Sequence, residues 1–294
     1  MDGASSAPLR WLNIRRVDAQ NEEGITRTAR PLLNWASAYA DHFDMGRLDI
    51  THAQHVKCGV KRLVQGSRDG PRNPPKLVDL LGVTSPETKL DIFTAGTDPN
   101  AATIVWAMTK LVKNPNSMKK ARQEVRNKAG NRGAIDENDL QQYGYLQAVI
   151  KETMRLHPLA PLLVPHETTQ KCNISGYEIR PKTVVHVNAW AIGRDPESWE
   201  NPEVFSPERF IGSSIDFRGR DFELIPFGAG RRGCPGLHMG VAVVEFALAN
   251  LLYWFNWEFP DGMKREDIDT DVKPGITMHK KNPLCLVPRK WSGN

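Results

Sequence analysis

One cysteine of this chain stands in a loop whose composition suits a reactive sulfur better than a buried one. The segment PFGAGRRGCPG, residues 226–236, surrounds Cys234 with four glycines, two prolines and two arginines. A cysteine kept for burial behaves as a small hydrophobe and sits among aliphatic neighbours, whereas glycines let the backbone turn tightly and bring amide groups to the sulfur. The loop therefore predicts a thiolate that acts as a metal ligand or as a nucleophile.

A long apolar helix is expected directly after this cysteine. The segment LHMGVAVVEFALANLLYWF, residues 237–255, has helical length and few charges. The first turn of such a helix has unpaired N–H groups and the positive end of the helix dipole, which both favour an anionic sulfur. Arg231 and Arg232, in the same loop, are placed to meet a carboxylate. The sequence thus predicts that Cys234 is a thiolate at the entrance of a helix.

The fixed residue types of this loop form a specific signature. From Phe227 to Gly236 the residues follow the pattern F-x-x-G-x-R-x-C-x-G, which would arise by chance in roughly one such chain in ten thousand. The loop resembles the haem-binding signature of the cytochrome P450 family. The resemblance implies haem b (iron protoporphyrin IX) as cofactor, with Cys234 as the iron ligand. It also implies that Phe227 shields the sulfur, that Arg232 pairs with a haem propionate, and that Gly228 and Gly236 let the backbone approach the ring.

A charged triad supplies independent support. Residues 152–155, ETMR, spell E-x-x-R, and PERF at residues 207–210 supplies a further arginine. Taken alone, an i,i+3 ion pair is usually exposed and contributes a few tenths of a kcal/mol. Its position upstream of PERF and then of the cysteine loop follows the order of the family. The resemblance therefore implies a structural triad of Glu152, Arg155 and Arg209 behind the haem.

The residues that would deliver protons depart from the family pattern. The family places a glycine, an acid and an alcohol on a long helix above the haem, and this chain reads AGTDPN with Pro99 in the alcohol position. Proline offers neither a hydroxyl nor an N–H, and it is expected to reinforce a break in the helix. By resemblance, Asp98 is the predicted catalytic acid. Thr97 and Asn100 are the predicted substitutes for the missing alcohol.

A second departure lies in the segment VPHET. The plant microsomal branch of the family, which this chain resembles most, usually has an arginine where this chain has His166. Histidine can still donate a hydrogen bond, with a charge that depends on pH. The resemblance thus implies His166 as another haem-propionate contact, with a surface-loop histidine as the alternative.

The elements that must position these residues are mainly helical with a small β region, as in the C-terminal part of the cytochrome P450 fold. Hydrophobic spacing predicts helices from Leu90 to before Pro115, over residues 115–129, and up to Leu156. The runs CNISGYEI and TVVHVNAWAI predict two strands of a small hairpin, with the turn at residues 180–182.

Two regions are expected along the chain. Residues 90–294 form the predicted haem-binding C-terminal portion of a cytochrome P450 domain, and residues 1–89 form an unassigned N-terminal segment. That first segment does not spell out the early strands, helices and membrane anchor of the family. We therefore expect a truncated chain in which the N-terminal part of the fold is missing or replaced.

Composition excludes several other classes of protein. The net charge of +5 arises from 39 basic and 34 acidic residues without a basic block, which argues against nucleic-acid binding. The four cysteines are scattered and form no C-x-x-C pair, so no zinc knuckle or dithiol centre is expected. No run of about 18 apolar residues is apparent, so no membrane segment is expected in this chain.

The resemblance implies a haem-thiolate monooxygenase that inserts one oxygen atom from O2 into a small, mainly apolar, specialised-metabolite-like substrate. An NADPH-dependent flavoprotein reductase would supply electrons at the cytosolic face of the endoplasmic reticulum; without an anchor, this chain would be cytoplasmic. Three alternatives stay open. They are a haem-dependent isomerase or dehydratase that needs no O2 activation, a haem-binding fragment with little turnover, and a haem-free thiol enzyme with Cys234 as nucleophile.

Overall fold

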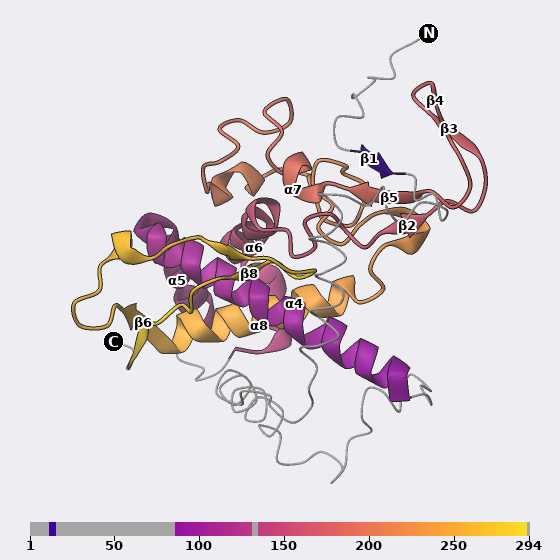
Figure 1. The fold of residues 1–294 in the computed structure, drawn as a ribbon. Helices are drawn as coiled ribbons and strands as arrows, with labels where there is room; N and C mark the ends of the chain where they lie inside the picture. Colours follow the sequence, from indigo (N-terminus) through magenta and orange to yellow (C-terminus); the bar gives the residue numbers. More distant parts are fainter. Residues whose placement is uncertain (1–11, 16–85, 131–134, 293–294) are drawn as a thin grey trace. The chain divides into compact units, whose positions relative to one another are not determined.

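The computed structural model describes residues 12–15, 86–130 and 135–292. One compact unit contains the strand β1 (Leu12–Arg15) and the chain from Gly96 onward, and a second unit ends at Ala95. All side chains discussed below belong to the first unit. Figure 1 draws the helices and strands that carry them.

The helices of the first unit form its core. They are α4 (Pro86–Lys113), which continues from the second unit, α5 (Pro115–Ala129), α6 (Gly144–Leu156), the short α7 (Ala189–Ile192) and α8 (Leu237–Trp254). Helix α5 packs on both α6 and α8, and α6 also contacts α8. The predicted bounds of α5 are confirmed, because Pro115 loses no needed hydrogen bond at the first helical position. Helix α4 begins at Pro86, earlier than predicted, and ends before Pro115 as predicted.

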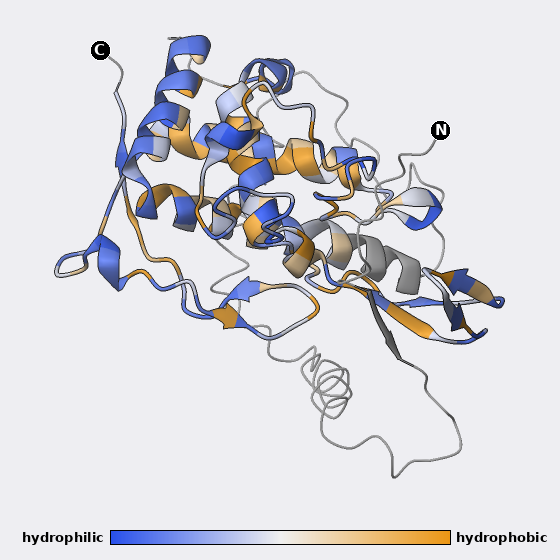
Figure 2. Ribbon diagram, turned by 90° about the horizontal axis from the view of Figure 1, so that it is seen from above, coloured by the Kyte–Doolittle hydropathy of each residue, from blue (hydrophilic) through white to orange (hydrophobic). Residues whose placement is uncertain are grey.

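Burial follows the apolar stripes of these helices. Leu111, Leu146, Ile150, Leu248 and Leu252 are each at most 1% exposed and belong to one hydrophobic cluster. Figure 2 shows hydrophobic residues concentrated on the helices of this core. Burying each leucine or isoleucine side chain contributes roughly 1.5–3 kcal/mol, so the packing of α4, α6 and α8 fixes the frame that carries the cysteine loop.

Helix α4 runs through Pro99 without interruption, so the predicted break is wrong. Proline removes the N–H that would bond the carbonyl of Ala95, and Ala95 is exposed, so water can satisfy that carbonyl. Side chains reinforce the neighbouring turns. Asn100 Nδ2 donates to the Gly96 carbonyl at 2.7 Å, and Thr103 Oγ1 donates to the Pro99 carbonyl at 2.9 Å.

The β region differs from the predicted hairpin. The hairpin forms inside the first run, between β3 (Cys172–Ile174) and β4 (Tyr177–Ile179). Ser175 and Gly176 both have positive φ angles, 49° and 87°, as a two-residue hairpin turn requires. The second run supplies β5 (Val184–Val187), which is the central strand between β1 and β2 (His166–Glu167), while its end forms α7. The predicted hairpin turn at residues 180–182 is therefore wrong, and the hairpin turn lies at Ser175 and Gly176.

The remaining elements are short strands and 3₁₀ helices. Two further antiparallel pairs are β6 (Phe255–Glu258) with β9 (Val287–Lys290) and β7 (Val272–Lys273) with β8 (His279–Lys280). The described residues also form the 3₁₀ helices η2 (Glu137–Gln142), η3 (Pro207–Phe210), η4 (Gly230–Arg232) and η5 (Arg265–Asp267). The expectation of a mainly α fold with a small β region is confirmed.

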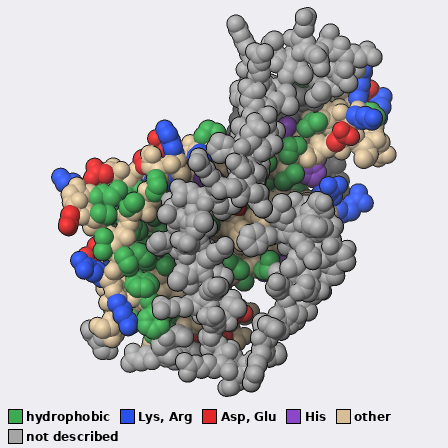
Figure 3. Space-filling view, turned by 60° about the horizontal axis from the view of Figure 1, so that its bottom comes forward, with side chains coloured by type: hydrophobic (Ala, Val, Ile, Leu, Met, Phe, Trp, Pro, Cys, Tyr) green, Lys and Arg blue, Asp and Glu red, His purple; other side chains and the backbone are tan. Residues whose placement is uncertain are grey.

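Helix α8 bears on the expectation that the chain has no apolar run long enough to cross a membrane. Of the helices in residues 86–130 and 135–292, it alone is long and apolar enough to cross a membrane by length and composition. Its buried residues, such as Val244 and Leu248, lie in the hydrophobic cluster with α5 and α6. On the face drawn in Figure 3, basic and acidic side chains are interspersed among hydrophobic ones.

Candidate functional site

The cysteine loop is closed by its own backbone. The Cys234 amide donates to the Phe227 carbonyl at 2.9 Å, and the Gly233 amide donates to the Gly230 carbonyl at 3.1 Å. Gly228 and Gly230 have φ angles of 73° and 71°, which side-chain-bearing residues rarely adopt. The glycines therefore bend the chain around the cysteine and fix its backbone.

The sulfur of Cys234 lies at the entrance of α8. Gly236 is the N-cap of that helix, and the Gly240 amide makes the first bond back to its carbonyl at 2.8 Å. Cys234 is a free, exposed cysteine. A Cβ added at Gly236 would lie 3.9 Å from the Cys234 Sγ. This is an ordinary van der Waals distance, so the sulfur lies directly beside the N-cap of α8.

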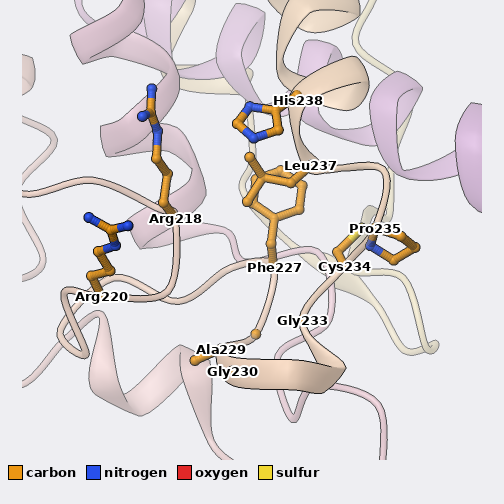
Figure 4. A pocket seen from close by; sticks show the side chains of 11 residues that line it. Arg218, Arg220, Phe227, Ala229, Gly230, Gly233, Cys234, Pro235, Leu237 and His238 are labelled. Atoms are coloured by element: carbon orange, nitrogen blue, oxygen red, sulfur yellow. The ribbon is translucent and has the colours of Figure 1, made fainter.

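The same loop borders a pocket of about 420 Å³. Figure 4 shows Arg218 and Arg220 extending toward the same side, with the Phe227 ring below Leu237 and His238. The Phe227 ring packs edge-on against Phe217, with ring centroids 5.8 Å apart. The pocket therefore combines an apolar wall with two guanidinium groups, a combination that suits a ligand with a flat apolar body and anionic substituents.

The predicted propionate contacts have different surroundings. Arg232 lies in η4, is exposed, and forms no ion pair with the residues that the structure describes, so its guanidinium can meet an incoming carboxylate. His166 lies in β2, is exposed, and pairs through its backbone with Val185. Neither side chain lines the pocket described above. Their roles toward a cofactor stay predictions.

The structure brings the three residues of the charged triad together. Glu152 and Arg155, both on α6 and at most 1% exposed, form two parallel bonds of 2.7 Å. Arg209 Nε lies 3.2 Å from Glu152 Oε1. The amide of Ser206 also donates to that oxygen at 2.8 Å. A carboxylate buried in this way is stabilised only because its lone pairs are occupied.

The triad also fastens the segment that follows α7. Arg155 donates to the carbonyls of Gly193 and Pro202, at 2.6 Å each, and to that of Val204 at 3.2 Å. Its guanidinium stands over the Trp199 ring, 5.2 Å from the centroid. These contacts bind α6 to the chain that leads to the PERF turn and then to the cysteine loop. They support the structural role predicted for the triad.

Gly193 provides a test of this packing. A Cβ at this position would overlap the backbone carbonyl oxygen of Arg155, so Gly193→Ala should destabilise the protein by about 1–3 kcal/mol. The measurement is urea unfolding followed by circular dichroism. Gly144→Ala is the matched control, because a Cβ there meets nothing within 4 Å. Equal stability of the two variants would contradict the packing described here.

The predicted distal residues lie on α4. The Asp98 carboxylate faces His279, whose Nε2 lies 3.2 Å from it. Burial raises the pKa of Asp98, but the hydrogen bond and charge of His279 and a hydrogen bond from Thr277 outweigh it, so the pKa lies below its usual value. The prediction of Asp98 as an acid therefore gains a partner that sequence reasoning had missed. No local pattern joins two residues 181 positions apart.

Thr97 and Asn100 are placed differently from each other. The Asn100 amide nitrogen is engaged with the Gly96 carbonyl, and a Cβ added at Gly240 of α8 would lie 3.3 Å from its Oδ1. Asn100 thus faces the helix that follows the cysteine, whereas Thr97 is exposed. Of the two predicted substitutes for the alcohol, Asn100 is the one that approaches α8.

Comparison with protein families gives a direct match. The family model described as cytochrome P450 matches residues 86–287. Cytochrome P450 71A1 of Persea americana is 58% identical over 201 residues, which cover 68% of this chain and 40% of that protein. Desmethyl-deoxy-podophyllotoxin synthase of Sinopodophyllum hexandrum is 54% identical over 199 residues, covering 68% of this chain and 39% of that protein. The chain thus spans about two fifths of the length of these relatives.

Solved structures give the same assignment. A zebrafish cytochrome P450 structure with progesterone superposes with a TM-score of 0.60 at 28% identity, covering 68% of this chain and 44% of that chain. The heme domain of cytochrome P450DA has the same TM-score at 22% identity, which bears on the fold alone. The match of the family model over most of the chain, together with the cysteine loop and the triad, shows that this chain belongs to the cytochrome P450 family.

Proposed function

We propose that this chain carries the haem-binding part of a monooxygenase that oxidises a small, mainly apolar plant metabolite. The observation that carries the proposal is the exposed Cys234 thiol, held by a glycine-rich loop at the entrance of α8. Membership of the cytochrome P450 family makes haem b the cofactor to expect at that sulfur.

The residues around Cys234 fit a haem. A Cβ at Gly236 would come into van der Waals contact with the Cys234 Sγ, so glycine leaves the most room beside the sulfur. The side chain of Arg232 is exposed and has no ion-pair partner in the described part of the chain, so it can bind a propionate. The Phe227 ring, packed on Phe217, can shield the sulfur from water. Cys234 would thus hold the iron, with Phe227 and Arg232 as supporting contacts.

Thiolate-ligated haem supplies oxygen activation, because the thiolate donates electron density that favours O–O cleavage. The chain's own contribution is to present the Cys234 sulfur, exposed and unpaired, at the entrance of α8. On α4, the Asp98 carboxylate can accept a proton and pass it on, while Pro99 has neither a hydroxyl nor an N–H to offer. The side chain of Asn100 stabilises the helical turn of residues 96–100, which contains both, by its bond to the Gly96 carbonyl.

Substrate, partner and location follow from the relatives. One relative is named as a synthase of desmethyl-deoxy-podophyllotoxin, so we propose an apolar specialised metabolite as the substrate class. Monooxygenation needs two electrons, and we propose an NADPH-dependent flavoprotein reductase as their source, at the cytosolic face of the endoplasmic reticulum. Arg231, which is exposed in the cysteine loop, would suit an acidic partner surface together with nearby basic residues.

Labelled oxygen provides the test. The 294-residue chain is loaded with haem, mixed with the reductase and NADPH, and given a panel of apolar terpenoids and phenylpropanoids under isotopically labelled O2. We expect an NADPH-dependent product that carries one labelled oxygen atom. Conversion of an oxygenated substrate without label or NADPH would replace the proposal with an isomerase or dehydratase. Haem uptake without any product would identify a haem binder that does not turn over.

A further inference from the structure

The acid on α4 is held by a histidine from a distant hairpin. His279 lies on β8, and its Nε2 is 3.2 Å from the Asp98 carboxylate. The two side chains are 38% and 39% exposed, so the pair stands between the interior and solvent. Thr277, two residues before His279, also hydrogen-bonds to Asp98. The side chains of Asp98, Thr277 and His279 therefore meet directly before Pro99 on α4.

Backbone bonds place His279 independently of this contact. The Met278 carbonyl accepts a 2.7 Å bond from Trp106 Nε1, and Trp106 is a fully buried residue of α4. The Met278 amide donates to the Leu159 carbonyl at 2.7 Å. Trp106 lies about two helical turns after Asp98 on α4. The residue before His279 is thus bonded to the same helix that carries the acid, and the pair does not depend on flexible side chains alone.

Imidazole supplies what the α4 segment lacks. Pro99 offers no hydroxyl and no N–H, whereas a histidine has two nitrogens that donate and accept in turn. When Nε2 carries the proton that faces Asp98, Nδ1 can accept a proton from water. Transfer breaks the Nε2–H bond of the imidazolium and forms an O–H bond on the carboxylate. The neutral ring then keeps its remaining proton on Nδ1. Once Asp98 has passed its own proton on, a tautomer change that returns the ring proton to Nε2 restores the starting state.

We propose that His279 is a positioning residue that fixes the Asp98 carboxylate and conducts protons to it from solvent. This inference rests on the proposed function, because monooxygenation consumes O2, two electrons and two protons for each oxygen atom inserted and each water released. The redox partner supplies the electrons, and water supplies the protons. In this chain a histidine–carboxylate pair thus stands in place of an acid–alcohol pair.

The alternative is a purely structural tie between β8 and α4, and three variants separate the two. They are His279→Gln, Asp98→Asn and the double variant. Lys281→Gln is the control, because Lys281 directly follows β8 and its exposed side chain lies 3.9 Å from that of Asp271. The bond from its amide to the Asp271 carbonyl uses the backbone and is unaffected by the substitution. The first readout needs no haem: nitrogen-detected NMR of the imidazole ring reports which tautomer His279 adopts.

We expect a dominant Nε2–H tautomer in the unmodified chain and in Lys281→Gln, and a mixture of tautomers in Asp98→Asn. The second readout uses the haem-loaded protein with its reductase. We expect His279→Gln to lower product formed per NADPH by about tenfold, with the balance released as peroxide, and to alter the solvent isotope effect. The double variant should lose no more than either single one, because the two residues act as one unit.

Two results would overturn the inference. An unchanged tautomer in Asp98→Asn would mean that His279 does not hold the carboxylate in solution. Unchanged product yield and solvent isotope effect in His279→Gln, with the tautomer result as expected, would mean that the pair is structural. If the unmodified chain forms no product, the proposed function and the conducting role both fail, and the tautomer measurement still decides whether His279 positions Asp98.

Discussion

Replacing Cys234 with serine should abolish the thiolate-type Soret band of the reduced, carbon monoxide-bound protein. A serine hydroxyl keeps the size of the side chain, but it does not ionise near neutral pH and binds iron weakly. The loop should survive, because its closing bonds use the backbone of residue 234 and not its sulfur. We therefore expect loss of the spectral signature, and a fall in haem affinity of at least about tenfold, with an unchanged far-ultraviolet circular dichroism spectrum.

Cys285→Ser provides the matched control. Cys285 is also a free, exposed cysteine of the described residues, but it lies outside the pocket and outside the cysteine loop. Its replacement should leave the band in place. A thiolate-type band that persists in Cys234→Ser, or that disappears in Cys285→Ser, would show that the iron ligand has been assigned to the wrong residue. A histidine-type band in the unmodified chain would also exclude Cys234 as the ligand.

Replacing Glu152 with glutamine should destabilise the fold more than a surface substitution can. The carboxylate is fully buried and accepts bonds from Arg155, Arg209 and the Ser206 amide. Without its charge, the Arg155 guanidinium stays buried with carbonyl partners only. Breaking a buried pair at one end costs about 3–5 kcal/mol. Urea unfolding of the haem-free protein should show a loss of this size.

Glu203→Gln tests whether this loss depends on burial. Glu203 also pairs with an arginine, Arg194, at 3.2 Å, but its side chain is 71% exposed. Exposed pairs contribute about 0–1 kcal/mol, so this variant should unfold almost as the unmodified chain does. A loss of less than about 1 kcal/mol in Glu152→Gln would contradict the structural role of the triad. A second readout is the combination with Arg155→Met, which should recover part of the lost stability because it removes the unpaired charge.

Local rules accounted for much of the fold. Proline has no N–H and has a preset φ angle, so Pro115 marked the start of α5 at the correct residue. A prediction from local composition was wrong for the hairpin within residues 172–187. Arg180-Pro181-Lys182 has the composition of a turn, yet the hairpin turn lies at Ser175 and Gly176. Several turns were compatible with the sequence, and the pairing of β5 with β1 and β2 selected among them.

The candidate site divides in the same way. The sequence by itself determined that Cys234 follows a glycine-rich turn and precedes a long helix, because glycine conformations and helix starts depend on residues a few positions apart. It also determined which charges could form the triad. Only the tertiary structure decided that α4 continues through Pro99 and that Asp98 meets His279. The contact between Asp98 and His279 depends on the bonds of Trp106 and Leu159 to Met278, which place β8 against α4. Contacts between residues so far apart in the chain form only when the core brings their elements together.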